Sequence, residues 1–86
     1  MSDIHLLGID LGKSNFHVCA CDSANRILFK KKLSRNQLIE LLASTHPTTV
    51  AFESCGGAHW LARKCEALGH QAKLIPPQYV KPYVKT

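Results

Sequence analysis

The sequence predicts an α/β domain built on a mixed sheet of five strands. Segments rich in β-forming residues fill its first third, and helical segments alternate with short strands afterwards. In chain order the expected elements are β-β-β-α-β-α-β. Turns join the first three strands, which makes them an antiparallel meander, whereas helices join the later strands. The 86 residues suffice for one small domain, and 45% apolar with 20% charged residues is ordinary for a globular chain.

The first three strands are expected at residues 4–10, 16–21 and 26–33. Residues 4–10 (IHLLGID) are mostly apolar, as in a central strand that is buried on both faces. Residues 16–21 (FHVCAC) are rich in β-forming side chains and lie between two turns. The Lys-rich half of residues 26–33 (RILFKKKL) suits an exposed edge strand, where charge discourages pairing with another sheet.

The first helix is expected to begin at Ser34, because Ser34 and Gln37 have the spacing of a capping box. Residues 45–48 (THPT) break the helical pattern and end this helix. Its expected apolar face consists of Leu38, Ile39, Leu41 and Leu42.

Two further strands are expected at residues 49–53 (TVAFE) and 71–75 (QAKLI), the second ended by Pro76 and Pro77. Between them, residues 58–68 predict a second helix, and Gly69 stands where a glycine often ends a helix. One side of that helix is expected to carry Leu61, Lys64, Cys65 and Leu68. Right-handed crossovers would make both strands parallel to the first one. This order of elements is that of the RNase H-like fold.

Asp10 and Glu53 are the candidate catalytic and metal-binding residues. Each follows an apolar strand directly, and a carboxylate at the end of a buried strand is costly unless it is paired or binds a metal. If the two strands are adjacent and parallel, both carboxylates meet at the rim where open α/β sheets bind ligands. Carboxylate oxygens suit Mg²⁺ or Mn²⁺, and two such ions can clamp a phosphoryl displacement, a chemistry that needs more than two carboxylates.

Each carboxylate also has an ordinary structural explanation. Taken alone, Asp10 is better explained as a turn residue that accepts hydrogen bonds from its own backbone, and Glu53 as a strand-end charge that faces water. The matching positions of the two residues favour the metal site.

The chain is basic, with 11 Lys and Arg against 6 Asp and Glu, a formal charge of +5. Such a surplus suits a polyanionic partner such as DNA or RNA, although a solvated basic surface would look the same. Trp60, Tyr79 and Tyr83 are candidates for stacking on bases, but Trp60 lies in a helix and is better explained as a core or partner-facing residue. The candidates for phosphate contacts are Lys13, Lys30, Lys31, Lys32, Arg35, Lys81 and Lys85, of which Lys13 is closest to Asp10.

The sequence contains no apolar run of about 18 residues and no secretion signal, so we expect a cytoplasmic protein without a membrane partner. The four cysteines are accordingly interpreted as reduced thiols. They lack the paired C-x₂-C spacing of structural zinc sites, which disfavours zinc. They are Cys19, Cys21, Cys55 and Cys65.

Two segments resemble a known family. Residues 8–13 (GIDLGK) and 52–57 (FESCGG) are similar to the first two acidic motifs of the DEDD transposases, insertion-sequence enzymes with a RuvC-like N-terminal domain that are also described as bridge-RNA-guided recombinases. The resemblance runs from about residue 4 to residue 86 and includes residues 75–77 (IPP) and 80–83 (VKPY). It implies that residues 1–86 are the N-terminal part of a single RuvC-like domain of an enzyme that cuts and joins DNA strands.

The resemblance also implies roles and partners. Asp10 would be the first ligand and Glu53 the second ligand of a divalent-metal site that uses Mg²⁺ or Mn²⁺. The family's next two aspartates, and its C-terminal domain with a serine nucleophile, would follow beyond Thr86. DNA, a guide RNA and further copies of the full-length protein would be the partners. We therefore expect these 86 residues alone to bind nucleic acid weakly and to have no turnover.

Two other functions remain open at this point. Residues 8–15 (GIDLGKSN) also resemble the first phosphate loop of the actin, Hsp70 and sugar-kinase superfamily, where backbone N–H groups hold the phosphates of ATP. The need for a second lobe and the Glu-Ser-x-Gly-Gly sequence after the fourth strand count against that alternative. The third possibility is a non-catalytic nucleic-acid-binding module that uses charge alone, for which Asp10 and Glu53 would be dispensable.

Overall fold

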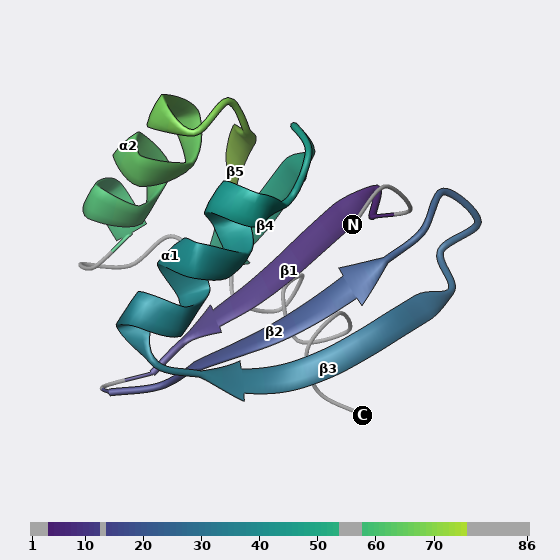
Figure 1. Ribbon diagram of the computed structural model, residues 1–86, viewed down its shortest axis with the longest axis horizontal. Coiled ribbons are helices and arrows are strands. Elements are labelled where there is room, and N and C mark those ends of the chain that lie inside the picture. The colour runs from purple at the N-terminus through teal and green to yellow at the C-terminus, as the bar shows by residue number, and fades with distance from the viewer. Residues whose placement is uncertain (1–3, 13, 54–57, 76–86) are drawn as a thin grey trace.

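The computed structural model describes residues 4–12, 14–53 and 58–75, which form a five-stranded sheet with two helices (Figure 1). The β-β-β-α-β-α-β order predicted from the sequence is confirmed. The strands are β1 (Leu6–Leu11), β2 (Phe16–Cys21), β3 (Ile27–Leu33), β4 (Thr49–Glu53) and β5 (Gln71–Ile75), and the helices are α1 (Arg35–Ser44) and α2 (Ala58–Ala67). The largest departure is at the start of β1, two residues later than expected.

The strands lie in the order β3-β2-β1-β4-β5. β1 and β3 are antiparallel to β2, whereas β4 is parallel to β1 and β5 is parallel to β4. This mixed sheet agrees with the RNase H-like fold expected from the sequence. β1 is the central strand, between the antiparallel meander and the two strands that follow helices.

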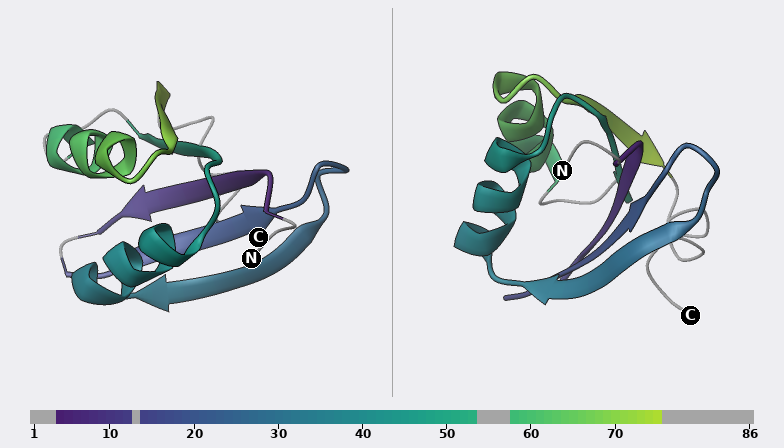
Figure 2. Two further views of the ribbon diagram at one scale, coloured as in Figure 1. Left: turned by 45° about the horizontal axis from the view of Figure 1, so that its top comes forward. Right: turned by 45° about the vertical axis from the view of Figure 1, so that its right-hand side comes forward.

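Both helices cover the same face of the sheet (Figure 2). Alternate residues of the three central strands point to that face and are almost fully buried there. They pack with apolar residues of α1 and α2 into a single core. The central strands contribute Leu7, Ile9, Val18, Ala20, Val50 and Phe52, and the helices contribute Leu38, Leu42, Ala58, Leu61 and Cys65. We call the opposite side of the sheet the helix-free face, with reference to the described residues.

Helix α1 begins with the capping box that the sequence predicts. The Ser34 hydroxyl accepts a hydrogen bond from the Gln37 backbone N–H at 3.2 Å, and the Gln37 side-chain carbonyl accepts one from the Ser34 N–H at 2.9 Å. Two N–H groups that the first turn would leave unpaired are thereby satisfied. Leu38 and Leu42 of the expected apolar face are buried, and Leu41 packs against the core.

The predicted glycine, Gly69, caps the C-terminal end of helix α2. Gly69 has a φ of +92°, its N–H bonds the Glu66 carbonyl at 3.1 Å, and the His70 N–H bonds the Cys65 carbonyl at 2.8 Å. This pair of bonds is a Schellman motif, and it aims the chain directly into β5. Of the four residues expected along one side of this helix, Leu61 and Cys65 are buried in the core and Leu68 packs against it, whereas Lys64 is exposed because its charge is better solvated by water.

Candidate metal centre

Asp10 and Glu53 occupy equivalent positions at the carboxyl ends of two adjacent strands. The parallel pairing of β1 with β4 matches Leu6 with Thr49 and continues to Ile9 with Phe52. Asp10 and Glu53 are the residues that directly follow this last pair on the two strands. The sequence-based hypothesis that the two strands are adjacent and parallel is therefore confirmed.

Both carboxylates belong to the helix-free face. Their preceding neighbours, Ile9 and Phe52, are fully buried in the core on the other face, and successive side chains of a strand alternate between faces. Asp10 and Glu53 are half-buried, and within the described part of the chain neither side chain makes a hydrogen bond or an ion pair. Among those residues, no partner occupies the carboxylate oxygens.

The donor chemistry fits part of a site for a divalent metal ion. Two carboxylates are hard oxygen donors of the kind that Mg²⁺ and Mn²⁺ take, and Mg²⁺ commonly uses one or two carboxylates together with water and substrate phosphate. Among residues 4–12, 14–53 and 58–75, no group of three or more His, Cys, Asp or Glu is placed to hold a metal. Further ligands would have to be water, substrate or residues outside the described ranges.

A tight turn follows the acidic end of β1. The Gly12 N–H donates to the Asn15 carbonyl at 3.0 Å, which closes the connection to β2. A Cβ atom on Gly12 would lie 2.6 Å from that same oxygen, closer than real Cβ contacts. Glycine is thus required for this close approach of two backbone segments, and the turn fixes where the strand that carries Asp10 ends.

The antiparallel meander brings two basic residues to the same row of the sheet. β2 pairs His17 with Asp10, and β3 pairs Lys32 with His17. Residues paired in this way project from the same face, so His17 and Lys32 share the helix-free face with the carboxylates, and both are exposed. No role for His17 beside Asp10 was predicted from the sequence, although pairing the two strands outward from the turn between them indicates one.

The predicted phosphate contacts are divided between the two faces. Lys30 and Lys32 lie on the helix-free face, while Lys31 lies on the other, with its ammonium nitrogen 5.0 Å from the centroid of the Phe29 ring. Lys73, which the sequence analysis did not single out, pairs with Ala51 and shares the face of Lys30. Three other candidates fall outside the described residues, as do two of the stacking candidates: Lys13, Lys81 and Lys85, and Tyr79 and Tyr83.

Trp60 is a core-facing residue, as its helical position suggested. Its ring packs edge-on against Phe16, with centroids 6.1 Å apart at 75°, and it borders the core. The guanidinium carbon of Arg35 lies 4.1 Å from the Trp60 ring centroid, a cation–π contact. Arg35, a candidate for phosphate contact, is therefore engaged with an aromatic side chain.

The cysteines of the described residues are buried thiols. Burial raises the pKa of Cys65 to about 11, and burial together with the neighbouring Cys21 thiol raises that of Cys19 to about 11. The sulfur atoms of Cys19 and Cys21 are 4.0 Å apart. A protonated, buried thiol behaves as a small hydrophobe, in line with the sequence-based interpretation. Cys55 is outside the described residues.

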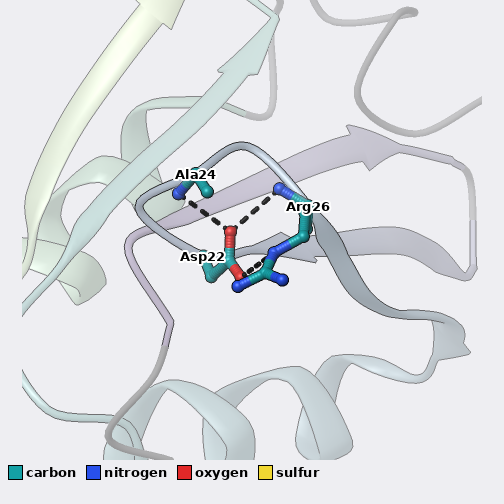
Figure 3. A network of polar contacts seen from close by, with 3 residues as sticks. All are labelled: Asp22, Ala24 and Arg26. Atoms are coloured by element: carbon teal, nitrogen blue, oxygen red, sulfur yellow. Dashed lines mark hydrogen bonds and ion pairs between the residues drawn. The ribbon is translucent and has the colours of Figure 1, made fainter.

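A hollow among the described residues lies at the other end of the sheet from the carboxylates. It encloses about 730 Å³ and is lined by residues that precede β1 and surround the β2–β3 turn, among them His5 and Arg26. In that turn Asp22 accepts hydrogen bonds from the N–H groups of Ala24 and Arg26 at 2.9 Å, and from the Arg26 side chain at 3.0 Å (Figure 3). These bonds lower the pKa of Asp22 and hold the hairpin closed. The charges of Asp22 and Arg26 therefore stabilise the β2–β3 turn.

Comparisons with known proteins agree on one family. A model of transposases, that of the DEDD transposases of insertion sequence IS110, matches residues 7–86. The transposase for insertion sequence element IS1328 of Yersinia enterocolitica is 49% identical over the whole chain, which covers 26% of that relative. A probable family 20 transposase of Pseudomonas aeruginosa is 42% identical over 92% of the chain and 23% of the relative.

A third relative has a lower sequence identity, but the match again extends over the whole chain. The transposase for insertion sequence element IS1111A of Coxiella burnetii is 37% identical over the whole chain and 24% of the relative. The chain thus spans about a quarter of the length of these curated relatives. Within the described residues, neither helix is long and apolar enough to cross a membrane.

Proposed function

Because the chain belongs to the DEDD transposase family of insertion sequence IS110, we propose that it is the N-terminal part of an enzyme that cuts and joins DNA strands in transposition. In this proposal Asp10 and Glu53 are two ligands of a catalytic divalent metal ion. The observation that carries the proposal is their equivalent placement, on one face, at the carboxyl ends of adjacent parallel strands.

The two residues would act by holding Mg²⁺ or Mn²⁺ through their carboxylate oxygens. When bound, the metal supplies charge stabilisation for an in-line displacement at phosphorus. Strands β1 and β4 fix the two backbones relative to each other, and the core beneath them resists movement. Neither carboxylate has to give up a hydrogen bond within the described residues in order to bind the ion.

The proposed partners follow from the family. DNA is the substrate, and a guide RNA and further copies of the full-length protein are the additional partners that the resemblance implies. We place this activity in the cytoplasm. For the 86 residues alone we propose weak nucleic-acid binding without turnover, since two carboxylates are fewer than the two-metal chemistry needs.

The two rival functions are less well supported. The family match and the relatives favour a transposase over a phosphate-loop protein of the actin, Hsp70 and sugar-kinase type. A non-catalytic nucleic-acid-binding module gives no reason for two uncommitted carboxylates to share one row of a sheet.

Metal binding tests the proposal without an assay of catalysis. Titration of Mn²⁺ is expected to raise the melting temperature, because an ion that binds only the folded chain stabilises it by about 1.4 kcal/mol at ten times its Kd. For a domain of this size that corresponds to a rise of roughly 6 °C or more. Asp10→Asn and Glu53→Gln are expected to abolish the rise.

The matched control is Glu40→Gln, which neutralises an exposed carboxylate of α1 and is expected to keep the full response. If Asp10→Asn and Glu53→Gln both respond to Mn²⁺ as the unmodified chain does, the metal binds elsewhere and the proposal is wrong. Stabilisation by ATP that Asp10→Asn does not alter would instead support the phosphate-loop alternative.

A further inference from the structure

The pairing of strands sorts the basic residues of β3 by face. Lys32 is paired with His17, which is paired with Asp10, so these three residues form one row across the sheet. Lys30 is paired with Cys19 in the next parallel row on the same face. Lys31 is paired with Val18, a core residue, and therefore projects from the face that carries the helices.

Lys30 and Lys32 are not used by the fold. Both are exposed, and within the described residues neither takes part in an ion pair or a ring contact. The positive charge of Lys30 acts to lower the pKa of the Cys19 thiol, against the raising effect of burial. Because Cys19 lies on the helix-free face, the charge of Lys30 lies over that face. Lys31, in contrast, rests on the Phe29 ring.

Two acidic residues lie in the same row of the sheet as Lys32. Asp10 and Glu53 are the two acidic residues within the five strands, and they stand at one end of the row that Lys32 occupies. Adjacent strands are about 4.8 Å apart, so the backbones of Lys32 and Asp10 are about 9.6 Å apart, with His17 between them. A long lysine side chain can cover much of that distance.

Resting on the function proposed above, we infer that Lys30 and Lys32 contact the phosphodiester backbone of a DNA strand and lead it from the β3 edge to Asp10 and Glu53. A chain of phosphates is the partner that fits both parts of this surface. Its phosphates are anionic and therefore complement the positive charges of Lys30 and Lys32. Its oxygens can also complete the coordination of a metal ion that is held by carboxylates. Contacts of this kind position a strand without reading its bases.

The test compares two double variants that remove the same charge from opposite faces. Lys30→Gln with Lys32→Gln alters the helix-free face, whereas Lys31→Gln with Lys64→Gln removes two exposed lysines from the side that carries the helices. Binding of a fluorescent single-stranded DNA oligonucleotide to the 86-residue chain is measured by anisotropy over a range of salt concentrations, with EDTA present so that metal plays no part.

The Lys30 and Lys32 variant is expected to bind several-fold more weakly and to lower the slope of log K against log salt by about 1.4, since each phosphate contact on a single strand contributes about 0.7. The Lys31 and Lys64 variant is expected to keep the original slope. Equal losses of DNA affinity in the two variants would overturn the inference, because the lysines of both faces would then contribute equally to DNA binding. A loss confined to a matched RNA oligonucleotide would overturn it in favour of RNA as the partner.

A second readout separates this inference from the proposed function. The Lys30 and Lys32 variant is expected to keep the Mn²⁺-dependent rise in melting temperature. If that rise is present but the two variants bind DNA equally, the DNA surface is wrong and the metal site stands. If the face-specific loss of DNA binding is present but no chain responds to Mn²⁺, the metal site is wrong and the DNA surface stands.

Discussion

At the scale of single residues, His70 shows how one buried polar side chain joins three elements. Its Nδ1 atom accepts a hydrogen bond from the Thr48 backbone N–H at 3.1 Å, so the ring proton is on Nε2, which donates to the Leu42 carbonyl at 2.6 Å. The end of α1, the approach to β4 and the start of β5 are thereby tied together. Both ring nitrogens are satisfied although the residue is only 4% exposed.

We expect His70→Ala to lower the free energy of unfolding by about 2–4 kcal/mol, because it leaves the Thr48 N–H and the Leu42 carbonyl without their partner and opens a cavity. Urea denaturation followed by circular dichroism measures the change. His59→Ala, in which an exposed histidine of α2 is removed, is the control and should stay within about 0.5 kcal/mol of the original chain. Equal effects of the two substitutions would show that the His70 bonds contribute nothing to stability.

The buried thiols set a limit to stability at high pH. Because the pKa values of Cys19 and Cys65 are raised from 9.0 to about 11, protonated thiols stabilise the fold fully below pH 9, and this contribution is lost as the pH rises towards 11. We expect Cys65→Val to reduce the loss of stability between pH 8 and pH 10.5, measured by urea denaturation. At pH 8, iodoacetamide should modify both cysteines far more slowly in the folded chain than in urea, and equal rates would contradict the assignment.

At the scale of elements, the β1–β2 turn links a backbone constraint to the candidate metal centre. Gly12 approaches the Asn15 carbonyl so closely that no side chain fits, and Asp10 stands two residues earlier. A turn that opened would disturb the last pairs of the hairpin, including Asp10 with His17. The position of the first acidic residue is therefore set partly by a glycine that has no polar side chain of its own.

We expect Gly12→Ala to cost about 1–3 kcal/mol of stability, the usual price of forcing an added group into a closed space. It should also weaken the Mn²⁺-dependent rise in melting temperature, although both carboxylates remain. Ser14→Ala alters an exposed residue of the same turn and serves as the control. A Gly12→Ala chain with unchanged stability and metal response would show that the turn can relax without moving Asp10.

At the scale of the whole molecule, the elements could be predicted because their signals are local. The capping box at Ser34, the glycine at residue 69 and the apolar segments each lie within a few residues of the boundary that they specify. The adjacency of Asp10 and Glu53 followed from one further rule, the right-handed connection between parallel strands. The role of the two residues as metal ligands stays a prediction.

Features that depend on contacts between distant segments could not be predicted in the same way. Three consecutive lysines give β3 no apolar alternation in that half, so the face of each lysine follows only from the register with β2, which shifts at Ala20 and Cys21. His70 has partners 22 and 28 residues away, and nothing in its immediate sequence indicates them. The same holds for Lys73, because only its pairing with Ala51 shows from which face of the sheet it projects.

The central position of β1 also has a consequence for how the chain folds. Contacts of β1 with β2, and of β2 with β3, join segments that are close in sequence. The pairing of β1 with β4, in contrast, joins segments that are far apart in sequence, such as Leu6 and Thr49. Closing the longer loop costs more entropy, so the meander is expected to form early and the parallel half late. Asp10 would then be in place before its partner Glu53 arrives, and affinity for a metal ion would report completion of the sheet.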